Sequence, residues 1–266
     1  ELLPELGGAI GALQHDGRDV LRPAPVAARD PLETSCFPLV PYANRIAHGR
    51  LEFGGHEHRL PLNFGNHPHS LHGLGWQAAW TVAEAGTDHA MLVHEHDGGA
   101  GWPWAYRAEQ RFVLAAGEMR VELSLTNAGD TPMPAGLGLH PYFPCDADTR
   151  LTFEAARVWL ADETMLPTEP AAAAQFGDWN AGASVAGTSL IDHAFAGWHG
   201  TARIEQRWGG FEVRAEGSTV LHIYRPPGAD FFCAEPVGHL PDAINRGGMD
   251  VQQPGETRAL TMRLRL

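Results

Sequence analysis

The sequence predicts an all-β protein, folded as one large antiparallel β-sandwich. Short segments in which polar and apolar residues alternate recur along its 266 residues, which is the period of a strand with one buried face. Glycines (31) and prolines (20) are scattered over the whole length rather than collected in a linker, so turns separate these segments throughout. Sustained helical periodicity is hard to find. We therefore expect a single domain over residues 1–266.

The expected strands follow one another between turn signals. They are RLEFGGHEHRLPL (50–62), YRAEQRFVLAA (106–116), EMRVELSLTNAG (118–129), RLTFEAARVWLAD (150–162), FEVRAEGSTVLHIYRP (211–226) and TRALTMRLRL (257–266). The clearest is 118–129, where Met119, Val121, Leu123 and Leu125 share one face. Only EPAAAAQF (169–176) is rich enough in alanine for a short helix, with Pro170 suited to its first turn.

Composition excludes several classes of function. A net charge of −13 argues against nucleic acid or an anionic membrane as the main partner. No stretch approaches the roughly 20 uninterrupted apolar residues that a membrane helix requires. All nineteen basic residues are arginine, which excludes Schiff-base chemistry on lysine, a pyridoxal lysine and a phosphate-binding loop with its lysine.

Cysteine spacing and the first residues bear on the cellular compartment. Cys36, Cys145 and Cys233 are far apart and form no CxxC pair, so neither a disulfide framework nor a thiolate metal site is expected. The first residues, ELLPELGGAI, lack a basic segment followed by an apolar run, so no secretory signal is expected there. We therefore expect a cytoplasmic protein.

Two histidine-containing segments break the alternating pattern. His140 stands in the apolar, turn-prone run GLGLHPYFP, where an imidazole at a strand end could act as an acid or base or could be a hydrogen-bonded structural residue. His72 follows in NHPHSLHGLGWQAAW, beside Trp76 and Trp80. These tryptophans could stack on a ligand, but a place in the core is the more common role. His69, in the same segment, is a further possible polar contact.

Three charged residues are candidates for the same site. Arg45 lies in YANRIAHGR, where a surface salt bridge is the alternative interpretation, and Asp192 lies in LIDHAFAGW. Glu235 stands in DFFCAEPVGH between apolar residues and Pro236. Partial burial there would raise the pKa of this carboxyl toward the range of a useful general base.

Pairs of histidines separated by one residue raise the possibility of a metal site. GGHEHR, HPHSLH and VHEHDG could each place two ligands on one side of a strand. A cupin-like enzyme would also need a glutamate, a Pro-Gly turn and a later histidine at fixed spacing, and none of the runs supplies that set. His56 and His58 flank a hairpin and are expected to be solvated.

Taken together, these segments resemble the aldose 1-epimerase (galactose mutarotase) family. The motifs are NRIAHGRLEFGGHEHRLPLN, HSLHGLGW, GLGLHPYF, LIDHAF, FFCAEPVGHLPDAIN and QQPGETRALTMRLRL, and they follow the order of the family from Arg45 to the C-terminus. One departure lies in LHGLGW, where Gly73 is kept and Leu74 replaces a second glycine. This departure bears on which sugar is preferred.

The resemblance implies a β-sandwich of the galactose mutarotase type, with a sugar on its concave face. It assigns Glu235 as general base and His140 as general acid, while Arg45, His72 and Asp192 hold sugar hydroxyls. The base removes the O1 proton while the acid protonates the ring oxygen O5, and the aldehyde rotates and recloses. A carboxylate and an imidazole on opposite sides of the ring suffice, with no metal or organic cofactor. The implied partner is a free aldose, with the chain a monomer or homodimer.

Three alternatives stay open beside this interpretation. A hexose-6-phosphate epimerase would need several basic side chains that converge on a phosphate, and only Arg45 is well placed. A non-catalytic sugar-binding module of the same fold would be expected to lack the acid or the base, whereas both are present. A histidine-ligated, cupin-like metal enzyme is the third.

Overall fold

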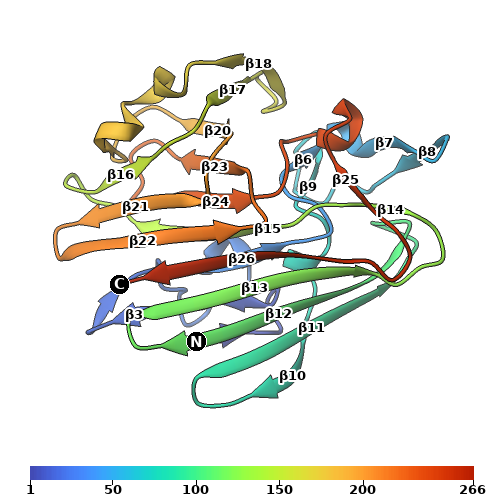
Figure 1. Cartoon of the computed structure of the whole chain (residues 1–266), viewed down its shortest axis with the longest axis horizontal. Helices are drawn as coiled ribbons and strands as arrows, with labels where there is room; N and C mark the ends of the chain where they lie inside the picture. The colour runs from blue at the N-terminus through green and yellow to red at the C-terminus, as the bar shows by residue number, and fades with distance from the viewer.

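Two nine-stranded antiparallel sheets, packed face to face, form most of the molecule, and the computed structural model describes all residues 1–266 (Figure 1). The first sheet contains, in spatial order, β1 (Leu2–Leu3), β2 (Ala9–Ile10), β5 (Cys36–Leu39), β15 (Gly138–Pro144), β24 (Phe231–Val237), β23 (Val220–Arg225), β20 (Ile191–Ala196), β17 (Arg157–Ala161) and β18 (Pro167–Ala171). The second contains β10 (Thr81–Ala85), β11 (His89–Asp97), β12 (Ala105–Ala115), β13 (Glu118–Asn127), β26 (Thr257–Arg265), β22 (Gly209–Glu216), β21 (Thr201–Gln206), β16 (Arg150–Phe153) and β19 (Ala183–Ser184). The predicted all-β fold class is therefore confirmed.

Short hairpins and single turns make up the rest of the secondary structure. Four two-stranded pairs are β3 (Gln14–His15) with β4 (Arg18–Asp19), β6 (Arg45–Ile46) with β9 (Ser70–Leu71), β7 (Arg50–Phe53) with β8 (His56–Arg59), and β14 (Met133–Ala135) with β25 (Asp250–Gln252). Six 3₁₀ turns are η1 (Pro31–Glu33), η2 (Ala47–Gly49), η3 (Gly75–Gln77), η4 (Ala173–Phe176), η5 (Trp179–Ala181) and η6 (Ala243–Arg246). None of the helical segments could span a bilayer.

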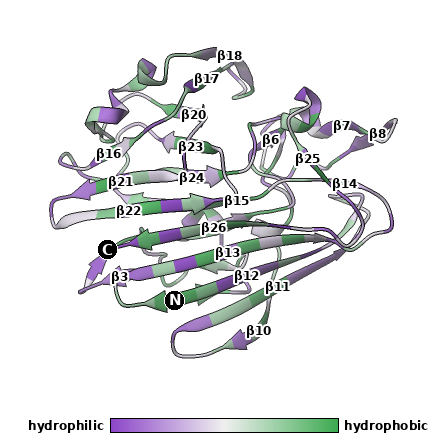
Figure 2. Ribbon diagram, in the orientation of Figure 1, coloured by the Kyte–Doolittle hydropathy of each residue, from purple (hydrophilic) through white to green (hydrophobic).

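Alternation along the strands of the second sheet builds the core. In β13 every second residue from Met119 to Asn127 is buried, as the period-two pattern predicts. Figure 2 shows hydrophobic and hydrophilic residues following one another along β13 and β22. The buried side chains meet the inner face of the first sheet, so that Leu123 and Leu139 belong to one apolar cluster.

The central strands of the first sheet are buried on both faces. In β24 all residues after Phe231 are buried, and in β15 all residues before Pro144. Their inner side chains join the main core, while their outer side chains form a second, smaller apolar cluster that includes Phe37, Tyr142 and Cys233. Continuous apolar runs are typical of strands covered on both sides. A polar side chain on the outer face of these strands is therefore buried too.

The expected helix at 169–176 is only partly present. Residues Ala173–Phe176 form one 3₁₀ turn, whereas Pro170 lies in β18 and pairs with Trp159 of β17. Four alanines are too few to nucleate a stable α-helix. A proline without an N–H group is tolerated on β18 because that strand is at the edge of its sheet.

Several single residues have the environment that the sequence predicts, and His58 differs. Trp76 and Trp80 are buried, as the core interpretation predicts. His56 is exposed in its hairpin, whereas His58 is half-buried because its ring packs 4.8 Å from that of Trp104, centroid to centroid. Cys36, Cys145 and Cys233 are free thiols, in agreement with the prediction of no disulfide.

Candidate active site

The five predicted site residues line one cavity. Its volume is about 390 Å³, and Arg45, His72, His140, Asp192 and Glu235 are all among its lining residues. They come from positions spread over most of the chain, yet they meet on the outer face of the first sheet. The sequence prediction that these residues share a site therefore agrees with the structure, while the role of each stays a prediction.

Strand register explains why four polar side chains point the same way. His140, Glu235, His222 and Asp192 come from β15, β24, β23 and β20, which are consecutive strands of the first sheet. His222 pairs directly with Glu235, and Asp192 lies two residues before Ala194, the partner of His222 on β20. Because side chains alternate between faces, all four lie on the outer face.

Arg45 and His72 lie on two chain segments that are joined by hydrogen bonds between Asn44 and His72. The His72 N–H donates to the Asn44 carbonyl (2.9 Å), and the Asn44 N–H donates to His72 Nδ1 (3.1 Å). Both Asn44 (φ 58°) and His72 (φ 60°) have left-handed backbone conformations. At Gly73, which follows, a Cβ atom would lie 2.3 Å from the Val40 carbonyl oxygen. This crowding explains why glycine follows histidine in the Leu-His-Gly motif.

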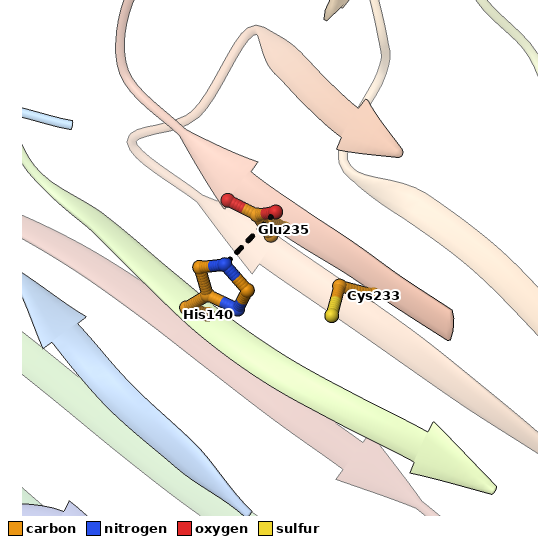
Figure 3. A group of neighbouring side chains, drawn as sticks. All are labelled: His140, Cys233 and Glu235. Carbon is orange, nitrogen blue, oxygen red and sulfur yellow. Dashed lines mark ion pairs between the residues drawn. The ribbon is translucent and has the colours of Figure 1, made fainter. Parts of the chain in front are cut away.

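The imidazole of His140 and the carboxyl of Glu235 face each other (Figure 3), and both line the cavity. His140 Nε2 lies 3.4 Å from Glu235 Oε1, and the side chains are 8% and 2% exposed. The ring of His140 stacks against those of Phe37 and Tyr142, with centroids 4.5 Å and 4.8 Å away. These contacts hold the imidazole in one orientation toward Glu235.

This arrangement corrects one expectation. The resemblance implied an acid and a base on opposite sides of a sugar ring, whereas His140 and Glu235 are neighbours. The reason is the direct pairing of β15 with β24. The pairs on either side, Gly138 with Val237 and Tyr142 with Cys233, place His140 across from Glu235.

Burial shifts the pKa values of this pair toward the neutral forms. Burial raises the pKa of Glu235 well above its usual value, and the charge of Asp192 adds to the shift. Burial lowers the pKa of His140 to about 3, and the charge of nearby His222 acts in the same direction. The rise for Glu235 agrees with the prediction from its apolar surroundings. Without a ligand, the pair therefore favours a protonated carboxyl beside a neutral imidazole.

Asp192 is held as a carboxylate by two partners. Arg45 Nη2 donates to Oδ2 (3.0 Å) and His222 Nε2 donates to Oδ1 (2.6 Å). Burial alone would raise the pKa of Asp192, but the His222 hydrogen bond and the Arg45 charge outweigh it and lower this pKa. The Arg45 side chain is 12% exposed, so the alternative of a surface salt bridge is wrong.

His222 and Asn44 are cavity residues that sequence reasoning missed. His222 is the one polar side chain inside VLHI, and a polar residue in a run buried on both faces is a usable signal. His222 can be assigned to the cavity only once β23 is known to lie between β24, which carries Glu235, and β20, which carries Asp192. Asn44 adjoins Arg45 and accepts from its Nη1 through Oδ1 (3.1 Å). His69 does not line the cavity, and its Nδ1 accepts from the His48 N–H.

Comparison with known proteins gives consistent matches. The family model described as aldose 1-epimerase matches residues 2–265. The uncharacterised Escherichia coli K12 protein YphB is 35% identical over 274 residues, which cover 98% of this chain and 93% of that protein. Galactose mutarotase of Mus musculus is 29% identical over 206 residues, which cover 71% of this chain and 59% of that protein.

Solved structures match over nearly the whole chain. A crystal structure from Escherichia coli K12 superposes with a TM-score of 0.89 at 36% identity and covers 98% of this chain and 92% of its own. A galactose mutarotase-like protein from Clostridium acetobutylicum superposes with a TM-score of 0.86 at 21% identity, over 99% of this chain and 90% of its own. The second likeness, at this identity, concerns the fold alone.

Proposed function

The chain belongs to the aldose 1-epimerase family, and we propose that it interconverts the α and β anomers of a free aldose. The observation that carries the proposal is the buried pair of Glu235 and His140, which lie 3.4 Å apart in the lining of the cavity. The matching family model spans residues 2–265, which supports the further proposal that the whole chain acts as one domain.

Glu235 is the general base and His140 the general acid in this proposal. In a cyclic aldose, O1 and the ring oxygen O5 are both bonded to C1, so a base for O1 and an acid for O5 must reach neighbouring atoms. A carboxyl and an imidazole side by side meet that requirement better than groups on opposite sides of the ring. Neither step calls for a group beyond these two side chains.

The proton balance fits a pair that holds one mobile proton. With the ring closed, that proton is on His140 and Glu235 is ionised. Glu235 takes the O1 proton while His140 gives its proton to O5, and the C1–O5 bond breaks to leave an aldehyde at C1. Rotation about C1–C2 presents the other face, and the reverse transfers close the ring as the other anomer. Burial, which favours the protonated carboxyl and the neutral imidazole, stabilises the protonation state of the open-chain stage.

Arg45, Asp192 and His72 are proposed to hold the hydroxyls that do not react. Arg45 offers a planar fork of donors and Asp192 offers acceptor oxygens, which together suit adjacent hydroxyls of a polyol. His72 Nδ1 is occupied by the Asn44 N–H, which leaves its other ring nitrogen for the ligand. The pKa of His72 is lowered well below its usual value by burial and by the charges of His140 and Arg45, so the ring binds as a neutral group.

The charge of the cavity favours a neutral sugar over a sugar phosphate. Among the fourteen lining residues, Arg45 is the one arginine, and its charge is already paired with Asp192. A phosphate dianion entering this cavity would find no free cation, which is an unfavourable place for a buried charge. We therefore propose a free aldose rather than a hexose 6-phosphate as the substrate.

The test is polarimetry on freshly dissolved α-galactose, α-glucose, α-arabinose and glucose 6-phosphate. We expect the protein to accelerate the approach to rotational equilibrium for at least one free aldose, and more strongly than for the phosphate. Binding of these sugars without acceleration would favour the non-catalytic sugar-binding alternative. Preferential acceleration of the phosphate would favour the hexose-6-phosphate alternative.

A further inference from the structure

A third side chain converges on the acid–base pair and has no part in the proposed proton transfers. Cys233 lies two residues before Glu235 on β24, so both side chains emerge on the outer face of the first sheet. The Cys233 Sγ, a ring nitrogen of His140 and a carboxylate oxygen of Glu235 all lie within 4.8 Å of one another (Figure 3). No other three His, Cys, Asp or Glu side chains of the protein come together in this way.

Two polar atoms of this group are buried without a hydrogen-bond partner. They are Nδ1 of His140 and Oε2 of Glu235. A buried polar atom without a partner is costly and uncommon in folded proteins, so these atoms indicate that the group is completed by something that binds to it. The sugar can satisfy some of this capacity from the cavity side. Cys233 is fully buried and does not line the cavity, so a sugar in the cavity does not reach its thiol.

The donor set has the chemistry of a zinc site. Imidazole nitrogen, thiolate sulfur and carboxylate oxygen are the three ligand types that Zn²⁺ takes in proteins, and sites with three protein ligands keep a fourth position open. That position would face the cavity, because His140 and Glu235 line it. A thiolate and a carboxylate together also balance the two positive charges of the ion.

We propose that His140, Cys233 and Glu235 form a binding site for a thiophilic divalent cation of the Zn²⁺ type, and that the bound cation inhibits the enzyme. The cation takes lone pairs of the imidazole and the carboxylate, and the thiol proton and any proton on Glu235 leave to the buffer. Neither group can then exchange a proton with a sugar. The inhibition rests on the proposed function, whereas the binding of the cation does not.

Other histidines and cysteines of the chain lack this convergence. His94 Nε2 is hydrogen-bonded to the Tyr106 hydroxyl, and His96 Nε2 donates to the Trp102 carbonyl, so the H-x-H pair of VHEHDG is already engaged. Cys145 is half-buried and outside both the cavity and the group. It therefore serves as the matched cysteine for a control.

The binding test uses Co²⁺ as a spectroscopic substitute for Zn²⁺ on protein freed of metal by a chelator. We expect one equivalent of Co²⁺ to produce a thiolate-to-cobalt charge-transfer band in the near ultraviolet. Cys233→Ala should abolish that band and Cys145→Ala should leave it intact. Since a cavity-forming substitution can disturb folding, Cys233→Ser is measured beside it. A saturating aldose, competing for the same two residues, should weaken Co²⁺ binding to the unmodified protein.

The inhibition test compares the mutarotation rate with and without Zn²⁺, so that each variant is its own reference. Loss of an outer-shell partner already costs roughly 10–100-fold in metal affinity, so Cys233→Ala should raise the half-inhibitory Zn²⁺ concentration by at least about 100-fold. Cys145→Ala should not change it. A chelator should restore the rate of the inhibited enzyme.

The outcomes separate the two proposals. An active enzyme without a thiolate band, or with inhibition that does not depend on Cys233, would overturn the cation site and leave the proposed function standing. A Cys233-dependent band on a protein that does not mutarotate any aldose would support the site and overturn the function. Activity lost to the chelator and regained with Zn²⁺ would overturn the inhibitory role.

Discussion

Replacing Glu235 with glutamine tests the proposed base with little change in shape. The side chain is 2% exposed, and the amide keeps its volume and hydrogen-bonding capacity but cannot accept the O1 proton. Removing a general base typically costs on the order of 10²–10⁴-fold in rate. Asp192, the other carboxylate of the cavity, has both oxygens engaged by Arg45 and His222, so it is a poor substitute. Turnover should therefore fall by at least about 100-fold, or roughly 2.7 kcal/mol of transition-state stabilisation.

The measurement is polarimetry for turnover, with calorimetry or tryptophan fluorescence for sugar binding. Binding should change far less than turnover, because the amide still fills the site. Glu256→Gln is the control, since Glu256 lies in the PGET turn, outside the cavity, where Oε2 accepts from the Gln253 N–H. A Glu235→Gln enzyme that still mutarotates freely would show that the base lies elsewhere, with Asp192 the next candidate.

Three further predictions concern the same cavity. Arg45→Ala should raise KM more than it lowers kcat, because a hydroxyl contact acts in ground and transition states alike. His140→Ala should mainly lower kcat. A near-normal kcat in His140→Ala would exclude His140 as the acid. His222→Leu removes a hydrogen bond to Asp192 and should weaken sugar binding by about tenfold in calorimetry, and an unchanged affinity would exclude a positioning role. Burial raises the pKa of Glu235, so the folded state favours the protonated carboxyl, and this contribution to stability is lost as pH rises through the raised pKa. In urea unfolding with a chelator present, Glu235→Gln should therefore become more stable relative to the unmodified protein as pH rises. A stability difference that is independent of pH would contradict the desolvation argument.

Local patterns were enough to predict the fold class and five residues that line one cavity. Alternation in 118–129 depends only on neighbouring residues, and β13 has the predicted buried face. Short motifs around Arg45, His140 and Glu235 follow the order of the family, so sequence alone is enough to identify these candidate residues. In secondary structure, 169–176 differs because strand pairing at Pro170 outweighed the helix propensity of the alanines. The runs 150–162 and 211–226 also differ, because each divides between two strands of different sheets.

Strand order and register determined the rest, because they join residues that the chain keeps far apart. His222 became a site residue only when β23 was placed between β24 and β20. The same register set Glu235 beside His140 rather than across a sugar ring, and brought Cys233 to both. Burial at the sheet face, which shifts both pKa values of the pair, follows from how the loops and the sheet close around the cavity. No local stretch of sequence carries that information, since each contact depends on the packing of several distant strands at once.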